Sequence, residues 1–188
     1  MITSNIALKE WSIVVEALGS GEQLLLVRKG GIRDPKGAFQ LKHREFLMYP
    51  TFEHQHEEAI RPEFRERFRR AAALAEPVQQ VPLQVYAGVA LCAEIRDPEK
   101  LQGLERYHIW QPEFFVDRMR YRPQEPTLVV VVRAYRLKEP INLPVKAEYD
   151  GCKSWVPLET SFPVEGAEPV MENQRFRKAL NEMSSRLE

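Results

Sequence analysis

Three of the four histidines in this chain lie within one short stretch, between His43 and His56. His43 stands close to Glu45, and an imidazole beside a carboxylate can move a proton near neutral pH. On a strand, His54 and His56 would point to one side, as histidines do in some metal sites. No cysteine pair and no His-Glu-x-x-His string accompanies them, so neither a metal nor a cofactor is predicted. The candidate catalytic residues are His43, Glu45, His54 and His56.

Other catalytic motifs fit less well. A restriction-type nuclease needs an Asp followed by Glu-x-Lys to hold Mg²⁺, and the nearest string, Glu148 to Lys153, has the wrong spacing. The chain has no Gly-x-Ser-x-Gly and no P-loop. Cys152 has no histidine partner nearby in sequence, so we expect it to be a small packed residue rather than a nucleophile.

The charge totals hide a strong segregation along the chain. Lys and Arg number 27, as do Asp and Glu, so the formal net charge is zero. Residues 28–44 nevertheless carry six basic side chains and one acid, residues 61–70 five Arg and two Glu, and residues 154–174 four Glu and no base. The first stretch flanks glycines, which let a backbone approach an anion closely, whereas the second is typical of a solvated helix face. The predicted phosphate-binding residues are Arg28, Lys29, Arg33, Lys42, His43 and Arg44.

Aromatic side chains could complete such a site, because every base has a face on which a ring can stack. The candidate stacking residues are Tyr49, Trp110 and Trp155. Each could equally be a core residue.

Hydrophobic spacing predicts the elements that position these residues. Leu8, Trp11, Val15 and Leu18 recur at helical intervals, which predicts a helix over 5–19. Further helices are predicted over 63–74, 97–104, 112–120 and 172–187. Short apolar runs predict strands over 23–27, 38–41, 45–49, 83–95, 128–137 and 153–158. The acidic stretch 158–172 is predicted to be a loop.

Helices and strands do not alternate regularly, which favours an α+β domain over a doubly wound parallel sheet. We expect a single domain over 1–188, built on a curled mixed sheet or partial barrel with flanking helices. The longest pure apolar run, Leu128–Val132, falls far short of the ~20 residues that span a bilayer. Two cysteines and an N-terminus without a signal-peptide pattern predict a cytoplasmic protein.

Several strings in the chain resemble a bacterial family known only as a domain of unknown function, number 1802. They are Ala7–Trp11, Glu16–Leu18, Gly21–Ile32, His43–Gln55, His108–Trp110, Arg118, Arg133–Leu137 and Gly151–Trp155. The family has no established activity. Some members are joined to a restriction-endonuclease-like domain, which implies a link to restriction–modification.

A second resemblance is to ASCH domains, at the level of fold. The stretch from Gly21 to Lys29 is similar to the opening of those domains, which belong to the PUA-like group of small barrels that bind RNA, nucleotides or modified bases. The order of strand 88–95, two short helices and strand 128–137 also follows that group, and implies a PUA-like fold. Gln23 departs from the Lys that ASCH domains carry at this point, to which a base contact is ascribed.

These observations predict a non-catalytic module that binds nucleic acid or a nucleotide. The alternative is an enzyme that acts on a phosphorylated or nucleotide substrate through His43 and Glu45, with His54 and His56 close by. A third interpretation is a protein that docks a partner through the helix at 172–187. Membrane insertion is not expected.

Overall fold

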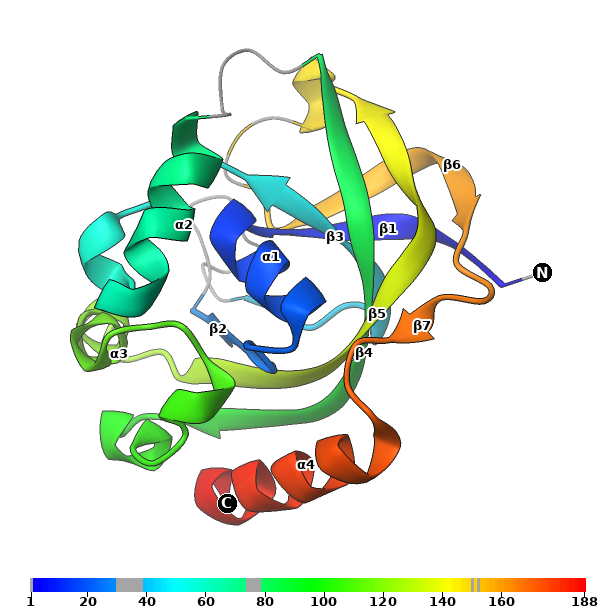
Figure 1. Cartoon of the computed structure of the whole chain (residues 1–188). Helices are drawn as coiled ribbons and strands as arrows, with labels where there is room; N and C mark the ends of the chain where they lie inside the picture. The colour runs from blue at the N-terminus through cyan, green and yellow to red at the C-terminus, as the bar shows by residue number, and fades with distance from the viewer. Residues whose placement is uncertain (1, 30–38, 74–78, 150, 152) are drawn as a thin grey trace.

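The computed structural model describes residues 2–29, 39–73, 79–149, 151 and 153–188. Within these residues one seven-stranded mixed sheet curls around helix α1 (Figure 1). The strands are β1 (Thr3–Trp11), β2 (Leu25–Arg28), β3 (Glu45–Thr51), β4 (Gln80–Ile95), β5 (Thr127–Pro144), β6 (Trp155–Pro163) and β7 (Glu168–Pro169). The α-helices are α1 (Ser12–Ser20), α2 (Pro62–Ala73), α3 (Pro112–Arg120) and α4 (Asn173–Leu187). Short 3₁₀ helices cover η2 (Glu57–Ala59), η3 (Pro98–Leu101), η4 (Glu105–Tyr107) and η5 (Ala147–Tyr149).

The sheet is mixed, and it is open in the described part of the chain. Its strands follow the order β2-β5-β4-β3-β1-β6, and β7 pairs with β5. β1 runs parallel to β3, and the other pairings are antiparallel. The predicted α+β class and curled mixed sheet are therefore confirmed.

The first strand overturns part of the prediction at the N-terminus. Residues 3–11 form β1 rather than the start of a helix, and α1 begins only at Ser12. Residues 7–11 of β1 are all buried, so the strand lacks the alternation that would have identified it. Leu8 and Trp11 match helical spacing only by coincidence. The pairing of β1 with β3 on one edge and with β6 on the other determines its extended conformation. The helix ends at Gly21, whose φ of 79° is the left-handed conformation that glycine adopts without strain.

Two further stretches differ from the prediction. Residues 39–41 form no strand, and Ala38 lies outside the described residues. Phe39 instead stacks on Trp155, with 5.9 Å between the ring centroids. β6 continues to Pro163 and β7 follows at Glu168, within the stretch predicted to be an acidic loop. Backbone pairing to β1 and β5 orders these residues although their side chains are largely exposed.

The curled sheet buries a hydrophobic core on each face. The larger core lies between α1 and the sheet and includes Ile13, Leu18 and Phe46. The smaller core, on the other face, includes Leu47, Leu83 and further aliphatic residues of β5 and β6. Helix α4 buries Phe176, Ala179, Met183 and Leu187 against the larger core (Figure 1). No described helix has the length and apolar character needed to cross a membrane.

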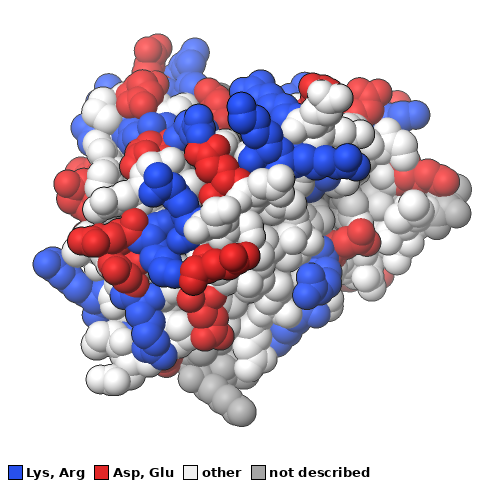
Figure 2. All heavy atoms as spheres, turned by 90° about the horizontal axis from the view of Figure 1, so that it is seen from below, with Lys and Arg blue, Asp and Glu red and all other residues white. Residues whose placement is uncertain are grey.

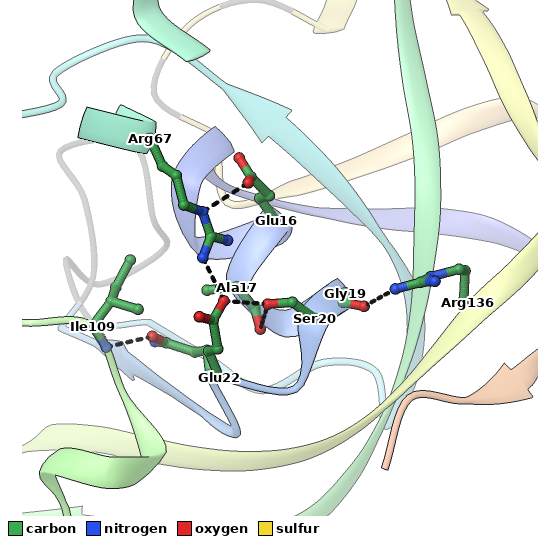
Figure 3. A network of polar contacts seen from close by, with 9 residues as sticks. Glu16, Ala17, Gly19, Ser20, Glu22, Arg67, Ile109 and Arg136 are labelled. Carbon is green, nitrogen blue, oxygen red and sulfur yellow. Dashed lines mark hydrogen bonds and ion pairs between the residues drawn. The ribbon is translucent and has the colours of Figure 1, made fainter. Parts of the chain in front are cut away.

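A polar network fastens α1 to its neighbours (Figure 3). The Arg67 guanidinium of α2 donates to the carboxylates of Glu16 and Glu22, at 2.9 and 2.6 Å. On the other side of the helix, Arg136 of β5 donates to the carbonyl of Gly19 at 2.5 Å. The helix is thereby held in the curl of the sheet by cations from two different elements.

Most described cations of the 61–70 stretch have partners of this kind. Arg69 forms a bidentate ion pair with Glu57, and Arg65 donates to the carbonyl of Ile60. Figure 2 shows the face that α4 covers, where basic and acidic side chains are intermixed. Most described cations of residues 61–70 therefore stabilise the fold. Among the described residues, the face that α4 covers has no continuous basic surface.

Removal of Arg67 should cost more stability than removal of its neighbour Arg69. We expect Arg67→Ala to lower the free energy of unfolding by about 1 kcal/mol, because its two ion pairs are partly shielded from water. Arg69→Ala should lower it by clearly less, because the Arg69 side chain is 65% exposed against 23% for Arg67. Urea denaturation of the two variants measures the difference, and equal losses would contradict it.

Candidate functional site

A cleft of 210 Å³ opens where β1 and β2 end. We call it the basic cleft. Its charged lining residues are Lys9, Arg28, Lys29, Arg118, Lys153, Glu10 and Glu53. Five cations thus face two carboxylates, which gives the cleft a formal charge of +3 in a chain of net zero charge. Cationic side chains gathered in a hollow concentrate the field there and attract anions.

Arg28 and Lys29 of the predicted phosphate site do line this cleft. The Arg28 guanidinium donates to the Glu10 carboxylate at 2.9 Å and to the carbonyl of Lys9 at 3.1 Å. Lys29 is only 3% exposed, and its ammonium donates to the carbonyl of Met119 at 3.0 Å. Burial lowers the pKa of Lys29, an effect that the Glu125 carboxylate opposes. Both residues set the local potential, but each already has partners in the protein.

Arg118 differs from the other cations of the cleft. It lies in the last turn of α3, packs its guanidinium over the Phe114 ring at 5.1 Å, and forms no hydrogen bond or ion pair with any described residue. Burial lowers its pKa; Glu10 opposes this effect, and the nearby positive charge of Arg28 adds to it. The Glu10 carboxylate acts on Arg118 through its charge and not through a hydrogen bond, and it accepts instead from Arg28 and from the backbone N–H of Trp11.

The remaining cations of the basic cleft have partners. The ammonium of Lys9 donates to the carbonyl of Gly151 at 3.1 Å, and that of Lys153 to the carbonyl of Glu148 at 2.9 Å. Arg118 is therefore a guanidinium with five N–H donors, partly removed from water beside other positive charges and unpaired among the described residues. Such a group is stabilised by an anion.

A second cavity of 480 Å³ adjoins the basic cleft. We call it the aromatic cavity. It is lined by Trp11, His54, His56, Glu58, Ala59, Glu113, Phe114, Asp117 and Arg118. Trp11, His54 and Arg118 line both hollows, so the two share a wall. His54 has a φ of 55°, a left-handed conformation that is uncommon outside glycine and concentrates at functional sites.

The four candidate catalytic residues do not come together. His43 and Glu45 lie at the start of β3, and His54 and His56 follow its other end. A seven-residue strand spans about 20 Å, so the two pairs cannot share one proton-transfer site. Burial, and then a hydrogen bond and charge from Glu45, raise the pKa of Tyr86 to about 12. His54 and His56 line the aromatic cavity.

The other predicted phosphate ligands lie outside the cleft. Lys42 and Arg44 are exposed just before β3, and Arg33 lies outside the described residues. His43 contacts the edge of Trp155, with 5.0 Å between ring centroids. A chain of contacts still joins this segment to the cleft, because Phe39 stacks on Trp155 and Arg28 lies 4.9 Å from the Phe39 centroid.

The predicted stacking residues are mostly used within the fold. Tyr49 is buried in the smaller core, and Trp110 is buried with Phe114 stacked on it at 4.1 Å. Trp155 is half-buried, with Phe39 on its ring and its indole N–H donated to the carbonyl of Gln40 at 2.9 Å. Trp11, which no stacking prediction included, is the tryptophan that lines both hollows.

Trp11 and Arg118 are the main residues that sequence reasoning missed. Arg118 lies outside both basic stretches, so the charge count could not identify it. The sequence feature that could have identified Arg118 is its position four residues after Phe114 on a predicted helix, because this spacing places the cation over the ring. Among the described residues, no group of three His, Cys, Asp or Glu side chains could hold a metal ion.

Comparison with known proteins gives a family and a similar fold. Residues 7–182 match the family model of the domain of unknown function DUF1802. No curated protein matches the chain. The ASCH protein from Zymomonas mobilis is similar in structure, with a TM-score of 0.46 and 12% identity over 94% of this chain and 93% of that one. A point mutant of that protein gives a TM-score of 0.46 and 12% identity, over 96% and 99% of the two chains.

These structural similarities concern the fold alone. The strings from Ala7 to Trp155 that resembled family 1802 fall within the matched range. Because the family model covers most of its length, the chain belongs to the DUF1802 family.

Proposed function

We propose that this domain binds the phosphate group of a nucleotide in the basic cleft, without catalysing a reaction on it. The nucleotide is either free or one exposed unit of a single nucleic-acid strand. The observation that carries the proposal is the guanidinium of Arg118, which lies unpaired among the described residues in a cleft of formal charge +3. A guanidinium binds a phosphate through two parallel N–H donors, with charge adding to the strength of each bond.

The size of the site favours a single nucleotide over a duplex. The basic cleft and the aromatic cavity measure 210 and 480 Å³ and share a wall. Together they fall in the range of ~300–1,000 Å³ that is typical of small-molecule sites. A duplex backbone would instead need a broad basic surface, which a cleft of 210 Å³ does not offer.

Two further cations of the predicted basic stretch 28–44 also have a role in this proposal. Lys42 and Arg44 are exposed near the contact chain that runs from His43 through Trp155 and Phe39 to the cleft. They could hold the next phosphates of a strand, whereas a free nucleotide would not need them. The link to restriction–modification rests on the family resemblance alone and stays a prediction.

The enzyme alternative has less support. It required His43 and Glu45 to act beside His54 and His56, but β3 separates the two pairs by about 20 Å. Glu53 and His54 also line the basic cleft, but no hydrogen bond joins these two described residues. Glu10 is held by Arg28 and the Trp11 backbone.

The test compares Arg118→Ala with Arg177→Ala on α4. Arg177 is exposed and lines neither hollow, so it is a matched control for the loss of one charge. We expect Arg118→Ala to weaken binding about 10- to 100-fold and Arg177→Ala less than twofold, since a charged hydrogen bond contributes about 1.5–3 kcal/mol. Arg118→Lys should fall between wild type and Arg118→Ala because it retains the charge but loses the planar donor pair.

Two probes distinguish the sources of the phosphate. Guanosine monophosphate is titrated calorimetrically, and a labelled single-stranded 12-mer of RNA or DNA is followed by fluorescence anisotropy at 50 and 200 mM salt. A strand ligand should depend on Lys42 and Arg44 and lose affinity steeply with salt, whereas the mononucleotide should depend on Arg118 alone. Absence of binding by both probes at 50 mM salt, or equal binding by wild type and Arg118→Ala, would overturn the proposal.

A further inference from the structure

We infer that the aromatic cavity receives the base of the bound nucleotide and selects bases that carry an amino group over uracil. The inference rests on the proposed function, and it names the ligand class of the same site. Its starting point is the shared wall: Arg118 lines both hollows, so a ligand whose phosphate meets this guanidinium in the basic cleft lies beside the aromatic cavity. A nucleotide has this shape, because the sugar separates its anionic end from its flat end.

The two hollows have opposite electrostatic character. The basic cleft has five cations and two carboxylates, whereas the aromatic cavity has three carboxylates, Glu58, Glu113 and Asp117, and the single cation Arg118 at its boundary. A ligand that fills both should therefore be anionic at one end and rich in hydrogen-bond donors at the other. A second phosphate is excluded from the aromatic cavity by the same charges.

The carboxylates are available to a ligand. Glu113 and Asp117 lie one turn apart on α3, where like charges destabilise a helix slightly. Glu58 and Glu113 form no ion pair with any described residue, and Asp117 has a loose contact with Arg120 at 3.8 Å. A ligand that donates to these oxygens would relieve their repulsion, so the arrangement has a cost in the free protein that binding would offset.

Aromatic rings give the cavity the walls that a base needs. Phe114 stacks on Trp110, and Arg118 lies over the Phe114 ring. Trp11 meets the Phe114 ring edge-on at 6.3 Å and the His56 ring at 6.1 Å. Trp11, Phe114 and His56 thus give the cavity a partly aromatic lining, and the exposed carboxylates lie at its rim.

The carboxylates then determine which base fits. An ionised carboxylate only accepts hydrogen bonds, so it favours the exocyclic amino groups of cytosine, adenine and guanine. Uracil has no amino group, and its two carbonyl oxygens would face negative charge. The predicted order is therefore an amino-bearing base over uracil, with the same phosphate contact in every case.

The experiment measures selectivity rather than affinity alone. Calorimetric titrations at 50 mM salt compare the monophosphates of guanosine, adenosine, cytidine and uridine. We expect the amino-bearing nucleotides to bind about tenfold more tightly than uridine monophosphate, since a good base contact is worth about 1–3 kcal/mol. In the double variant Glu113→Gln, Asp117→Asn the ratio should fall below about twofold, because an amide can also donate to the uracil carbonyls.

The control is Glu66→Gln on α2, an exposed glutamate outside both hollows. Loss of its charge can change all four affinities alike but should leave their ratio near tenfold. If wild type binds the four nucleotides equally in an Arg118-dependent manner, the selectivity inference is wrong and the proposed function stands. If the ratio survives in the double variant, these carboxylates do not select the base. If none of the four monophosphates binds, the selectivity inference is wrong, and the proposed function falls as well unless the single-stranded 12-mer binds in an Arg118-dependent manner.

Discussion

Gln23→Ala is expected to lower the free energy of unfolding by about 3 kcal/mol, a large fraction of the stability of a domain of this size. Gln23 is 0% exposed, and both ends of its amide are used. Its N–H donates to the carbonyl of Leu25 at 2.7 Å, and its oxygen accepts from the backbone N–H of Ile109 at 2.9 Å. The contact to Ile109 appears in Figure 3. Truncation leaves two buried backbone groups unpaired, each at a cost of about 1–3 kcal/mol.

Urea denaturation measures the loss, and two further variants identify its cause. Gln23→Met keeps most of the volume but removes both hydrogen bonds, so it should lose nearly as much as Gln23→Ala. Gln102→Ala, which truncates an exposed glutamine, should change stability by less than about 0.5 kcal/mol. If Gln23→Met is as stable as wild type, packing rather than hydrogen bonding explains the role of this residue.

The same two hydrogen bonds determine whether Gln23 could take part in a binding site. In this chain the side chain is enclosed in the core and bound to the backbone at both ends, so it cannot reach a ligand. Ligand contacts must come from other residues, which is consistent with a site at Arg118.

Acidification should destabilise the protein through His108. Burial, and then the positive charge of Arg61, lower the pKa of His108 to about 4 from 6.5. Between those values the unfolded chain binds a proton that the folded chain does not, so stability falls as the pH drops from 6.5 to 4. The expected contribution of this single group is about 3 kcal/mol. Above pH 6.5 the imidazole is neutral in both states and contributes no pH dependence.

The comparison with His108→Asn isolates this contribution. In the folded protein, Nδ1 of His108 accepts from the backbone N–H of Trp110 at 3.3 Å, and the Asn oxygen can take over that role. Carboxylate titrations are common to both proteins, so the difference between their stability curves reports the imidazole. We expect the wild type to lose about 3 kcal/mol more than the variant between pH 7 and pH 4. Parallel curves would show that His108 is protonated without cost in the fold.

The sequence predicted those elements whose local pattern agrees with their final surroundings. The helix at 112–120 has a proline in its first turn and was predicted with the bounds of α3. The alternating, valine-rich segments likewise predicted the cores of β4 and β5. β1 was missed because its buried half, residues 7–11, has apolar or enclosed side chains on both faces. Only its pairing with β3 and β6, far away in sequence, makes it a strand.

The residues of the candidate site were likewise predicted only where a local pattern in the sequence identifies them. Arg28 and Lys29 were found because their charge is concentrated locally in the chain. Arg118 and Trp11 were missed because their importance comes from tertiary proximity: α3 brings Arg118 to the end of β1. His43 and His54 showed the reverse error, since closeness in sequence suggested one site and an extended strand holds them apart.

The position of β1 between β3 and β6 has a consequence for how the protein is made. On the ribosome, β1 emerges early but pairs with Trp155 and Val156 of β6 only after most of the chain has been synthesised. At 5–20 residues per second this delay is about 7 to 30 s. During this delay, the edge of β1 that pairs with β6 has no partner, although residues 7–11 of this strand are all buried in the folded protein. Until β6 emerges, this edge of β1 is open to pairing with strands of other chains, so slow synthesis should favour aggregation of the nascent protein.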